Sequence, residues 1–120
     1  MKYKHIHSAI HNFGHSFTSR NNYVDGAFVI DELTDLHSKG NNIEVDWLTG
    51  RFSPETAATA RISKSIDYWR VTLQNHLDTH EVDLPSIVEL KFIWLATGRK
   101  FMSAIDDRGK SYKIYVNESK

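Results

Sequence analysis

The last third of the chain carries the pattern that most restricts its fold, an alternation of apolar and polar residues in three consecutive segments. These segments, Ile87–Thr97, Lys100–Ile105 and Lys110–Asn117, are separated by Gly98-Arg99 and by Asp106–Gly109. A period of two is typical of half-buried strands, and short polar intervals containing glycine are typical of hairpin turns. The pattern predicts a three-strand antiparallel meander.

The pairing of these strands decides which side chains face the core. If Ala96 pairs with Phe101 and Ile105 with Lys110, the apolar side chains gather on one face, and a shift by one residue would mix the two faces. That apolar face would hold Val88, Leu90, Phe92, Trp94, Ala96, Phe101, Ile105, Tyr112, Ile114 and Val116. The opposite face would hold Glu89, Lys91, Lys100, Ser111, Lys113 and Asn117. We expect a long helix on the apolar face.

Two amphipathic helices are predicted in the first third of the chain. From Tyr3 to about Thr18, apolar residues recur at helical spacing, and Gly14 within this segment costs about 1 kcal/mol relative to alanine. The apolar stripe of this first helix is Ile6, Ile10, Phe13 and Phe17. In the second helix, Asp25 is expected to cap the N-terminus and Gly40 to follow the C-terminus. Its apolar face is formed by Val29, Ile30, Leu33, Leu36 and His37.

A strand and a long helix are predicted next. From Asn42 to Leu48, apolar residues alternate with acidic ones, which is the pattern of a half-buried strand. After a short turn, Ser53 is expected to be the N-cap of the long helix, with Pro54 in its first position. The helix should end near Leu77 or His80. Its apolar stripe is Ala58, Ile62, Ile66, Trp69, Leu73 and Leu77.

These elements predict an α+β fold. Their order is helix, helix, strand, long helix and then the three-strand meander, with the helices packed on one antiparallel sheet. With 120 residues, the chain is expected to form one domain, 1–120, because domains usually have roughly 100–200 residues. No repeat, linker or shift in composition predicts a boundary within it.

Composition and charge exclude several classes of function. The chain has 15 Lys and Arg, 15 Asp and Glu, and no cysteine, so thiolate chemistry and the strong positive charge of a dedicated nucleic-acid binder are absent. No apolar run approaches the roughly 18 residues that span a membrane, and no apolar leader follows the first lysines, so a cytoplasmic location is expected. Glycine loops for phosphates and GxSxG elbows are also missing, which favours a protein that is not an enzyme.

The N-terminal segment is rich in histidine. On a helix, His7, His11 and His15 are spaced four residues apart and form a stripe separate from the apolar one. Two imidazoles one turn apart can chelate a divalent ion, and neutral imidazole suits Zn and Ni. Because no motif such as HExxH accompanies them, the pattern favours surface histidines and leaves a Zn or Ni site as the alternative.

A second histidine pair, His76 and His80, lies at the C-terminal end of the long helix. A protonated histidine in this position interacts favourably with the helix dipole, which is the structural interpretation of the pair. If this turn packed near His7, His11 and His15, three or more ligands would be available for a metal.

An apolar patch is predicted on the otherwise polar face of the meander. Ile93, Leu95 and Met102 are expected to gather there, with Tyr115 within reach. Either a helix of this chain or another protein must cover such a patch. We favour a second copy of the chain, because dimers are the commonest soluble oligomers.

The C-terminal hairpin region has a modest excess of positive charge. Its cations are Arg99, Lys100, Arg108, Lys110, Lys113 and Lys120. Tyr115 lies on the same face as Lys113, so this hairpin could bind a nucleic acid by stacking and charge. Lysines at a solvated sheet edge that discourage pairing with other chains are the simpler interpretation.

Three functions are therefore predicted, in order of preference. The first is a small binding or interaction module that self-associates as a homodimer and catalyses no reaction. The second is a divalent-metal-binding protein or metal-dependent hydrolase that uses His7, His11 and His15, with His76 and His80. The third is a weak nucleic-acid binder that uses the C-terminal hairpin.

Overall fold

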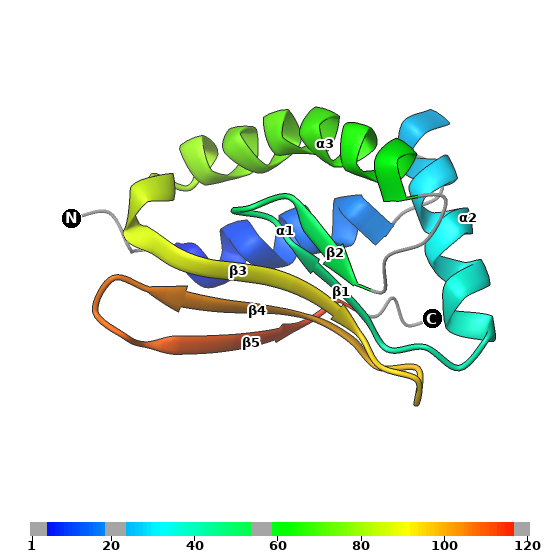
Figure 1. Ribbon diagram of the computed structural model, residues 1–120. Helices are drawn as coiled ribbons and strands as arrows, with labels where there is room; N and C mark the ends of the chain where they lie inside the picture. Colours follow the sequence, from blue (N-terminus) through cyan, green and yellow to red (C-terminus); the bar gives the residue numbers. More distant parts are fainter. Residues whose placement is uncertain (1–4, 19–23, 54–58, 117–120) are drawn as a thin grey trace.

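Three helices and a five-stranded antiparallel sheet form the described part of the protein (Figure 1). The computed structural model describes residues 5–18, 24–53 and 59–116. In chain order the elements are α1 (Ile6–Thr18), α2 (Val24–Ser38), β1 (Ile43–Asp46), β2 (Arg51–Ser53), α3 (Thr59–Thr79), the short 3-10 helix η1 (Leu84–Ser86), β3 (Ile87–Trp94), β4 (Lys100–Asp106) and β5 (Ser111–Tyr115). The predicted α+β class and element order are confirmed, and β2 and η1 are additions to them.

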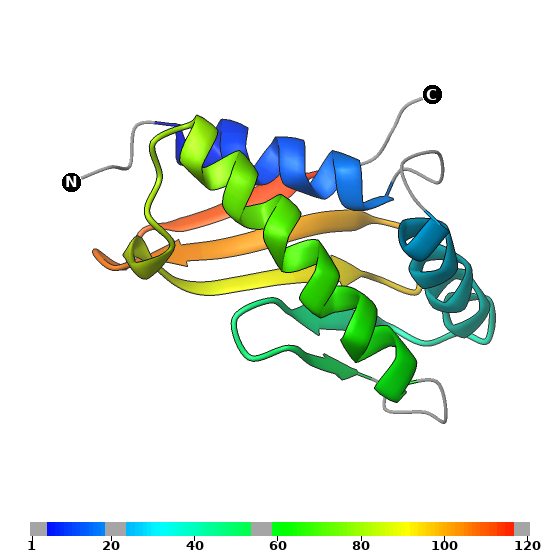
Figure 2. The same cartoon turned by 90° about the horizontal axis from the view of Figure 1, so that it is seen from above.

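The sheet has the strand order β2-β1-β3-β4-β5, and each strand runs antiparallel to its neighbours. The hairpin of β1 and β2 docks on β3, where Ile43 pairs with Trp94 and Asp46 with Lys91. Helices α1 and α3 cross one face of the sheet, and α2 stands at its end (Figure 2). We call this side the covered face. On the opposite side, the open face, no helix or strand of the described residues is seen.

Both turns of the meander have the same form, which the sequence analysis did not predict. The N–H of Gly98 donates to the carbonyl of Leu95 at 2.8 Å, and the N–H of Gly109 donates to the carbonyl of Asp106 at 3.0 Å. Both glycines have positive φ, +103° and +87°. Each hairpin therefore has a three-residue loop that ends in a left-handed glycine, a form common after a type I turn.

These loops correct the predicted register. Phe101 pairs with Ile93 instead of Ala96, and Ile105 pairs with Ser111 instead of Lys110. The shifts are three residues and one residue, and an odd shift moves a side chain to the other face. The two shifts cancel for β5, so β5 and the part of β3 from Glu89 onward have the predicted orientation, whereas β4 is inverted. A bulge between Ile87 and Glu89 leaves Val88, predicted for the core face, 57% exposed and buries Ile87 instead.

The inversion of β4 changes which of its side chains belong to the core. Met102 and Ala104 lie on the covered face and are completely buried. Phe101 and Ile105, predicted for the core face, instead lie on the open face with their partners Ile93 and Ser111. Met102 was predicted at an intermolecular contact, and this position is wrong because its side chain is already enclosed by the helices.

Close packing of α1 on the sheet depends on Gly14. A Cβ at this position would stand 2.4 Å from Cγ1 of Val116 and 2.9 Å from Cγ of Met102. No side chain fits at such distances, so glycine is required although it weakens the helix. The conformational cost that glycine brings to α1 is offset by direct contact between the helix backbone and β4 and β5.

An aromatic cluster fills the space between the helices and the sheet. Phe17 is at its centre, with ring-centroid distances of 4.9 Å to Trp47, 5.7 Å to Trp69 and 5.1 Å to Phe92. The rings meet edge to face, which is the arrangement that the ring quadrupoles favour. Residues from α1, the β1–β2 turn, α3 and β3 are thereby joined in one core.

The predicted start of the second helix differs from the observed one, and that of the long helix falls on residues outside the described ranges. Helix α2 begins at Val24, so Asp25 lies inside it and is not its N-cap. Ser53 is the last residue of β2, and α3 is described from Thr59. The predicted positions of Tyr3, Pro54, Ala58 and Asn117 lie outside the described residues, as does the side chain of Ile62. None of the described helices is long and apolar enough to cross a membrane.

Candidate functional site

The open face of the sheet is the first candidate site, because its side chains are not enclosed by the helices. Pairing across the sheet brings Glu44, Ile93, Phe101 and Tyr115 into one row. The next row contains Asp46, Lys91, Ser103 and Lys113. The alternation of a strand places all eight side chains on the same face.

An apolar stripe forms the middle of this face. Phe101 contacts Tyr115 at a ring-centroid distance of 5.7 Å, and Ile93 is its partner on β3. Nζ of Lys113 lies 4.8 Å from the centroid of the Phe101 ring, and Cζ of Arg99 lies 5.6 Å from that of Tyr115. Phe101 is 7% exposed beneath these neighbours, whereas Tyr115 is 45% exposed. The stripe therefore presents a partly covered apolar surface with cations along one side.

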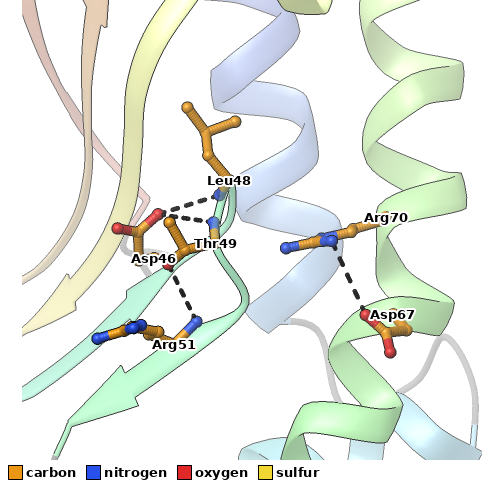
Figure 3. A network of polar contacts seen from close by, with 6 residues as sticks. All are labelled: Asp46, Leu48, Thr49, Arg51, Asp67 and Arg70. Atoms are coloured by element: carbon orange, nitrogen blue, oxygen red, sulfur yellow. Dashed lines mark hydrogen bonds and ion pairs between the residues drawn. The ribbon is translucent and has the colours of Figure 1, made fainter.

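The other side of the stripe is acidic. Glu44 and Asp46 project from β1 in the same two rows. One oxygen of Asp46 accepts hydrogen bonds from the N–H groups of Leu48 and Thr49 at 3.0 and 3.2 Å (Figure 3). These bonds fix the carboxylate at the start of the β1–β2 turn. The open face thus has carboxylates on β1, with Arg51 of β2 and Lys91 of β3 beside them, and Lys113 on β5.

An ion pair joins β1 to β3 on this face. Nζ of Lys91 lies 3.0 Å from Oε2 of Glu44. The hydrogen bond from Lys91 to Glu44 raises the pKa of the lysine against the opposing effect of desolvation, and the charges of Glu44, Glu89 and Asp46 raise it further. Lys91 therefore stays charged and lies between the acidic strand and the apolar stripe.

The fold does not bring all the predicted interface residues together on one face. Ile93 and Tyr115 lie in one row of the open face, and Phe101 stands between them where Met102 was predicted. Leu95 follows β3, and its backbone closes the β3–β4 turn. Phe101 was not predicted for this face because a different turn was assumed. A glycine at position 98, three residues after Leu95, could have indicated the three-residue loop.

The turn between β4 and β5 has a buried carboxylate, Asp106. One of its oxygens accepts the N–H groups of Arg108 and Lys110 at 3.0 and 2.9 Å, and the other accepts the hydroxyl of Tyr112 at 3.2 Å. Burial acts to raise the pKa of Asp106, but these hydrogen bonds and the charge of Arg108 outweigh it and lower the pKa. This carboxylate shapes the hairpin, because all its described contacts are local.

The histidines of α1 form the expected stripe. The rings of His7 and His11 are nearly parallel with centroids 6.4 Å apart, and the same distance separates His11 from His15. All three side chains are exposed. Their use as metal ligands stays a prediction.

The second histidine pair packs against α1 through other residues. Nε2 of His76 lies 3.4 Å from Oγ of Ser16, and Nε2 of His80 lies 3.4 Å from Nδ2 of Asn12. Nδ1 of His80 lies 2.9 Å from the carbonyl oxygen of His76, which can only accept, so Nδ1 carries a proton. The ring of His80 also contacts that of His5 at 6.1 Å. Burial and the nearby His80 lower the pKa of His76.

The residues that the structure describes contain no group of three or more His, Cys, Asp or Glu side chains placed to hold a metal ion. The C-terminal turn of α3 does approach α1, as a metal site would require. It meets Asn12, Ser16 and His5 there. The arrangement therefore explains His76 and His80 as contacts between two helices.

The cations of the C-terminal hairpin lie over aromatic rings of the sheet. Lys100 is 4.8 Å from the ring of Trp94 on the covered side, and Lys113 contacts Phe101 on the open face. Lys110 lies 5.2 Å from the ring of Tyr112. Lys120 lies outside the described residues. The charges are therefore divided between the two faces and do not form one track, and nucleic-acid binding stays a prediction.

Comparison of the chain with known protein families, with curated proteins and with solved structures finds no significant match.

Proposed function

We propose that the protein is a non-catalytic binding module that self-associates through the open face of its sheet, and that a second copy of the chain is the occupant of this face. The observation that carries the proposal is the apolar row of Ile93, Phe101 and Tyr115, with Glu44 of β1 at one end and Lys113 of β5 beside the other. Such a surface is complementary to itself when two copies face each other.

The charges select one orientation of the two copies. A twofold axis parallel to the strands, between β3 and β4, lays β1 of each copy over β5 of its partner. Asp46 then faces the partner's Lys113, and Ile93 faces the partner's Phe101. An axis perpendicular to the strands would instead lay β1 over β1, so that acidic side chains would face acidic side chains. Two twisted sheets pack in this aligned way at about 30°.

The size of the face sets the expected affinity. Strands β1, β3, β4 and β5 have 4, 8, 7 and 5 residues, and at about 4.8 Å between strands and about 3.3 Å per residue they present roughly 400 Å² per copy. Specific interfaces usually bury about 800 Å² per partner, and smaller ones belong to weaker complexes. We therefore expect a dimer with a dissociation constant in the micromolar range.

Sedimentation velocity over a concentration series tests the proposal. The protein should shift from monomer to dimer between about 1 and 100 μM, in line with micromolar affinity. Ile93→Lys puts a charge at the centre of the contact and should weaken association at least tenfold. Val71→Lys is the matched control, because Val71 is 62% exposed on α3, away from the sheet.

A protein that stays monomeric at 100 μM, or an Ile93→Lys variant that associates as well as the parent, would contradict the proposal. Circular dichroism of both variants separates loss of association from loss of folding.

A further inference from the structure

A small cavity lies where α3 passes the β1–β2 hairpin, apart from the open face. Its volume is about 150 Å³, and its lining comes from the hairpin turn, α3 and η1. The lining residues are Trp47, Leu48, Arg70, Leu73, Gln74 and Leu84. Its walls are therefore mainly apolar, with one cation among them.

Arg70 extends from α3 towards the hairpin turn (Figure 3). Its Nη2 lies 3.1 Å from the place that a Cβ on Gly50 would occupy, so the missing side chain of Gly50 leaves room for the guanidinium. Gly50 also has a positive φ of +74°, which the turn requires. Nη1 of Arg70 lies 3.9 Å from Oδ1 of Asp67, a long contact to an exposed carboxylate.

Three hydrogen-bond donors of the lining residues are shielded from solvent and have no acceptor within the described ranges of the chain. They are Nε and Nη2 of Arg70 and Nε1 of Trp47. Arginine and the tryptophan indole can only donate, so each needs an oxygen or another acceptor to be satisfied. The amide nitrogen of Gln74 is already bonded to Asp78 at 2.8 Å. The three shielded groups without a partner are thus all donors, and two of them belong to a guanidinium, which is positively charged.

We propose that this cavity binds a small carboxylate with an apolar body no larger than one ring. The carboxylate accepts from the Arg70 guanidinium, whose fork of N–H donors matches two carboxylate oxygens. The apolar body lies against Trp47, Leu73 and Leu84. An apolar cavity of about this volume holds benzene in another protein, so a single ring is the right size.

Benzoate and its neutral analogue benzamide are the matched probes, since they differ mainly in charge. Each probe is titrated into ¹⁵N-labelled protein, and binding is followed by the indole N–H signal of Trp47. Benzoate should bind at least tenfold more tightly than benzamide. Acetate tests the apolar part, because it has the carboxylate without the ring, and it should bind at least tenfold more weakly than benzoate. Both comparisons use the unchanged chain, so they do not depend on the folding of any variant.

Arg70→Met keeps most of the aliphatic part of the side chain and removes the guanidinium. It should weaken the binding of benzoate at least tenfold and leave the binding of benzamide unchanged. Arg51→Met is the control, because Arg51 is an exposed arginine of the same hairpin. Equal affinity for benzoate and benzamide, or parental benzoate binding by Arg70→Met, would overturn the proposal. Acetate binding as tight as benzoate would overturn the assignment of an apolar ligand.

Discussion

The two faces of the sheet are formed by the same strands, but their side chains have different surroundings. On the covered face, Phe92 and Met102 are completely buried, and α1 lies so close to the sheet that only glycine fits at its position 14. On the open face, Ile93 and Phe101 stand among charged residues, and Tyr115 remains 45% exposed. Neighbouring positions of β3 and β4 thus alternate between a surface used for folding and a surface available for binding.

This difference implies that the two faces respond differently to substitution. A change on the covered face leaves a cavity or an overlap that the tight packing cannot absorb. A change on the open face alters contacts with solvent or with another molecule, and most such changes have a small effect on folding. Stability and association should therefore be separable by face.

The largest expected effect comes from the aromatic cluster of the covered face. Phe17→Ala removes a ring that contacts Trp47, Trp69 and Phe92, and should lower the free energy of unfolding by about 3–5 kcal/mol. Ile93→Ala on the open face should change it by less than about 1 kcal/mol. Urea unfolding measures both changes in free energy, at a protein concentration well below the one at which dimers form. Similar losses for the two variants would remove the distinction between the faces.

A smaller effect is expected at Gly14. Alanine would gain about 1 kcal/mol of helix propensity, but its Cβ would overlap Val116 and Met102, which costs about 1–3 kcal/mol. We expect a net loss of stability in urea unfolding. Ser8→Ala is the control, since Ser8 is an exposed residue of the same helix and should be neutral or stabilising. A stabilised Gly14→Ala protein would show that α1 is not in close contact with the sheet.

The smallest expected effect concerns the pH dependence of the contact between α1 and α3. Burial and the neighbouring His80 lower the pKa of His76, so the unfolded chain takes up this proton at a higher pH than the folded protein. The free energy of unfolding should therefore fall as the pH drops from about 6.5 to the lower pKa of folded His76. His76→Gln should make this fall shallower, as measured by urea unfolding between about pH 7 and pH 5.

His11→Gln is the control for this titration, because the His11 side chain is exposed on the other stripe of α1. An unchanged pH dependence in His76→Gln, or an equal change in His11→Gln, would show that His76 is not the group responsible.

The sequence predicted the strands of the meander but not how they pair. Alternation is a property of each strand alone, so Leu90, Phe92 and Ile114 were correctly assigned to the core. The register depends on the turn. Two glycines with positive φ, Gly98 and Gly109, each end a three-residue loop where intervals of two and four residues were predicted, and periodicity cannot detect this difference. The core-facing residues of the third strand of the meander, β5, were predicted correctly only because the two odd register shifts cancel.

The candidate site was partly predictable for the same reason. Ile93 and Tyr115 follow from alternation, whereas Phe101 required the correct β3–β4 loop. Docking of β1 on β3, which brings Glu44 and Asp46 to the open face, joins segments far apart in the chain. No local pattern encodes such a pairing, and so the acidic side of the face was missed.

Chemical cross-linking tests the orientation of two open faces most directly, because the chain has no cysteine of its own. Glu44→Cys and Tyr115→Cys place single thiols at opposite ends of one row. A bismaleimide that spans about 10 Å, the spacing of packed sheets, should join a Glu44→Cys chain to a Tyr115→Cys chain faster than either variant joins to itself. Faster joining of two Glu44→Cys chains, or no cross-linked product at 100 μM, would contradict the proposed dimer.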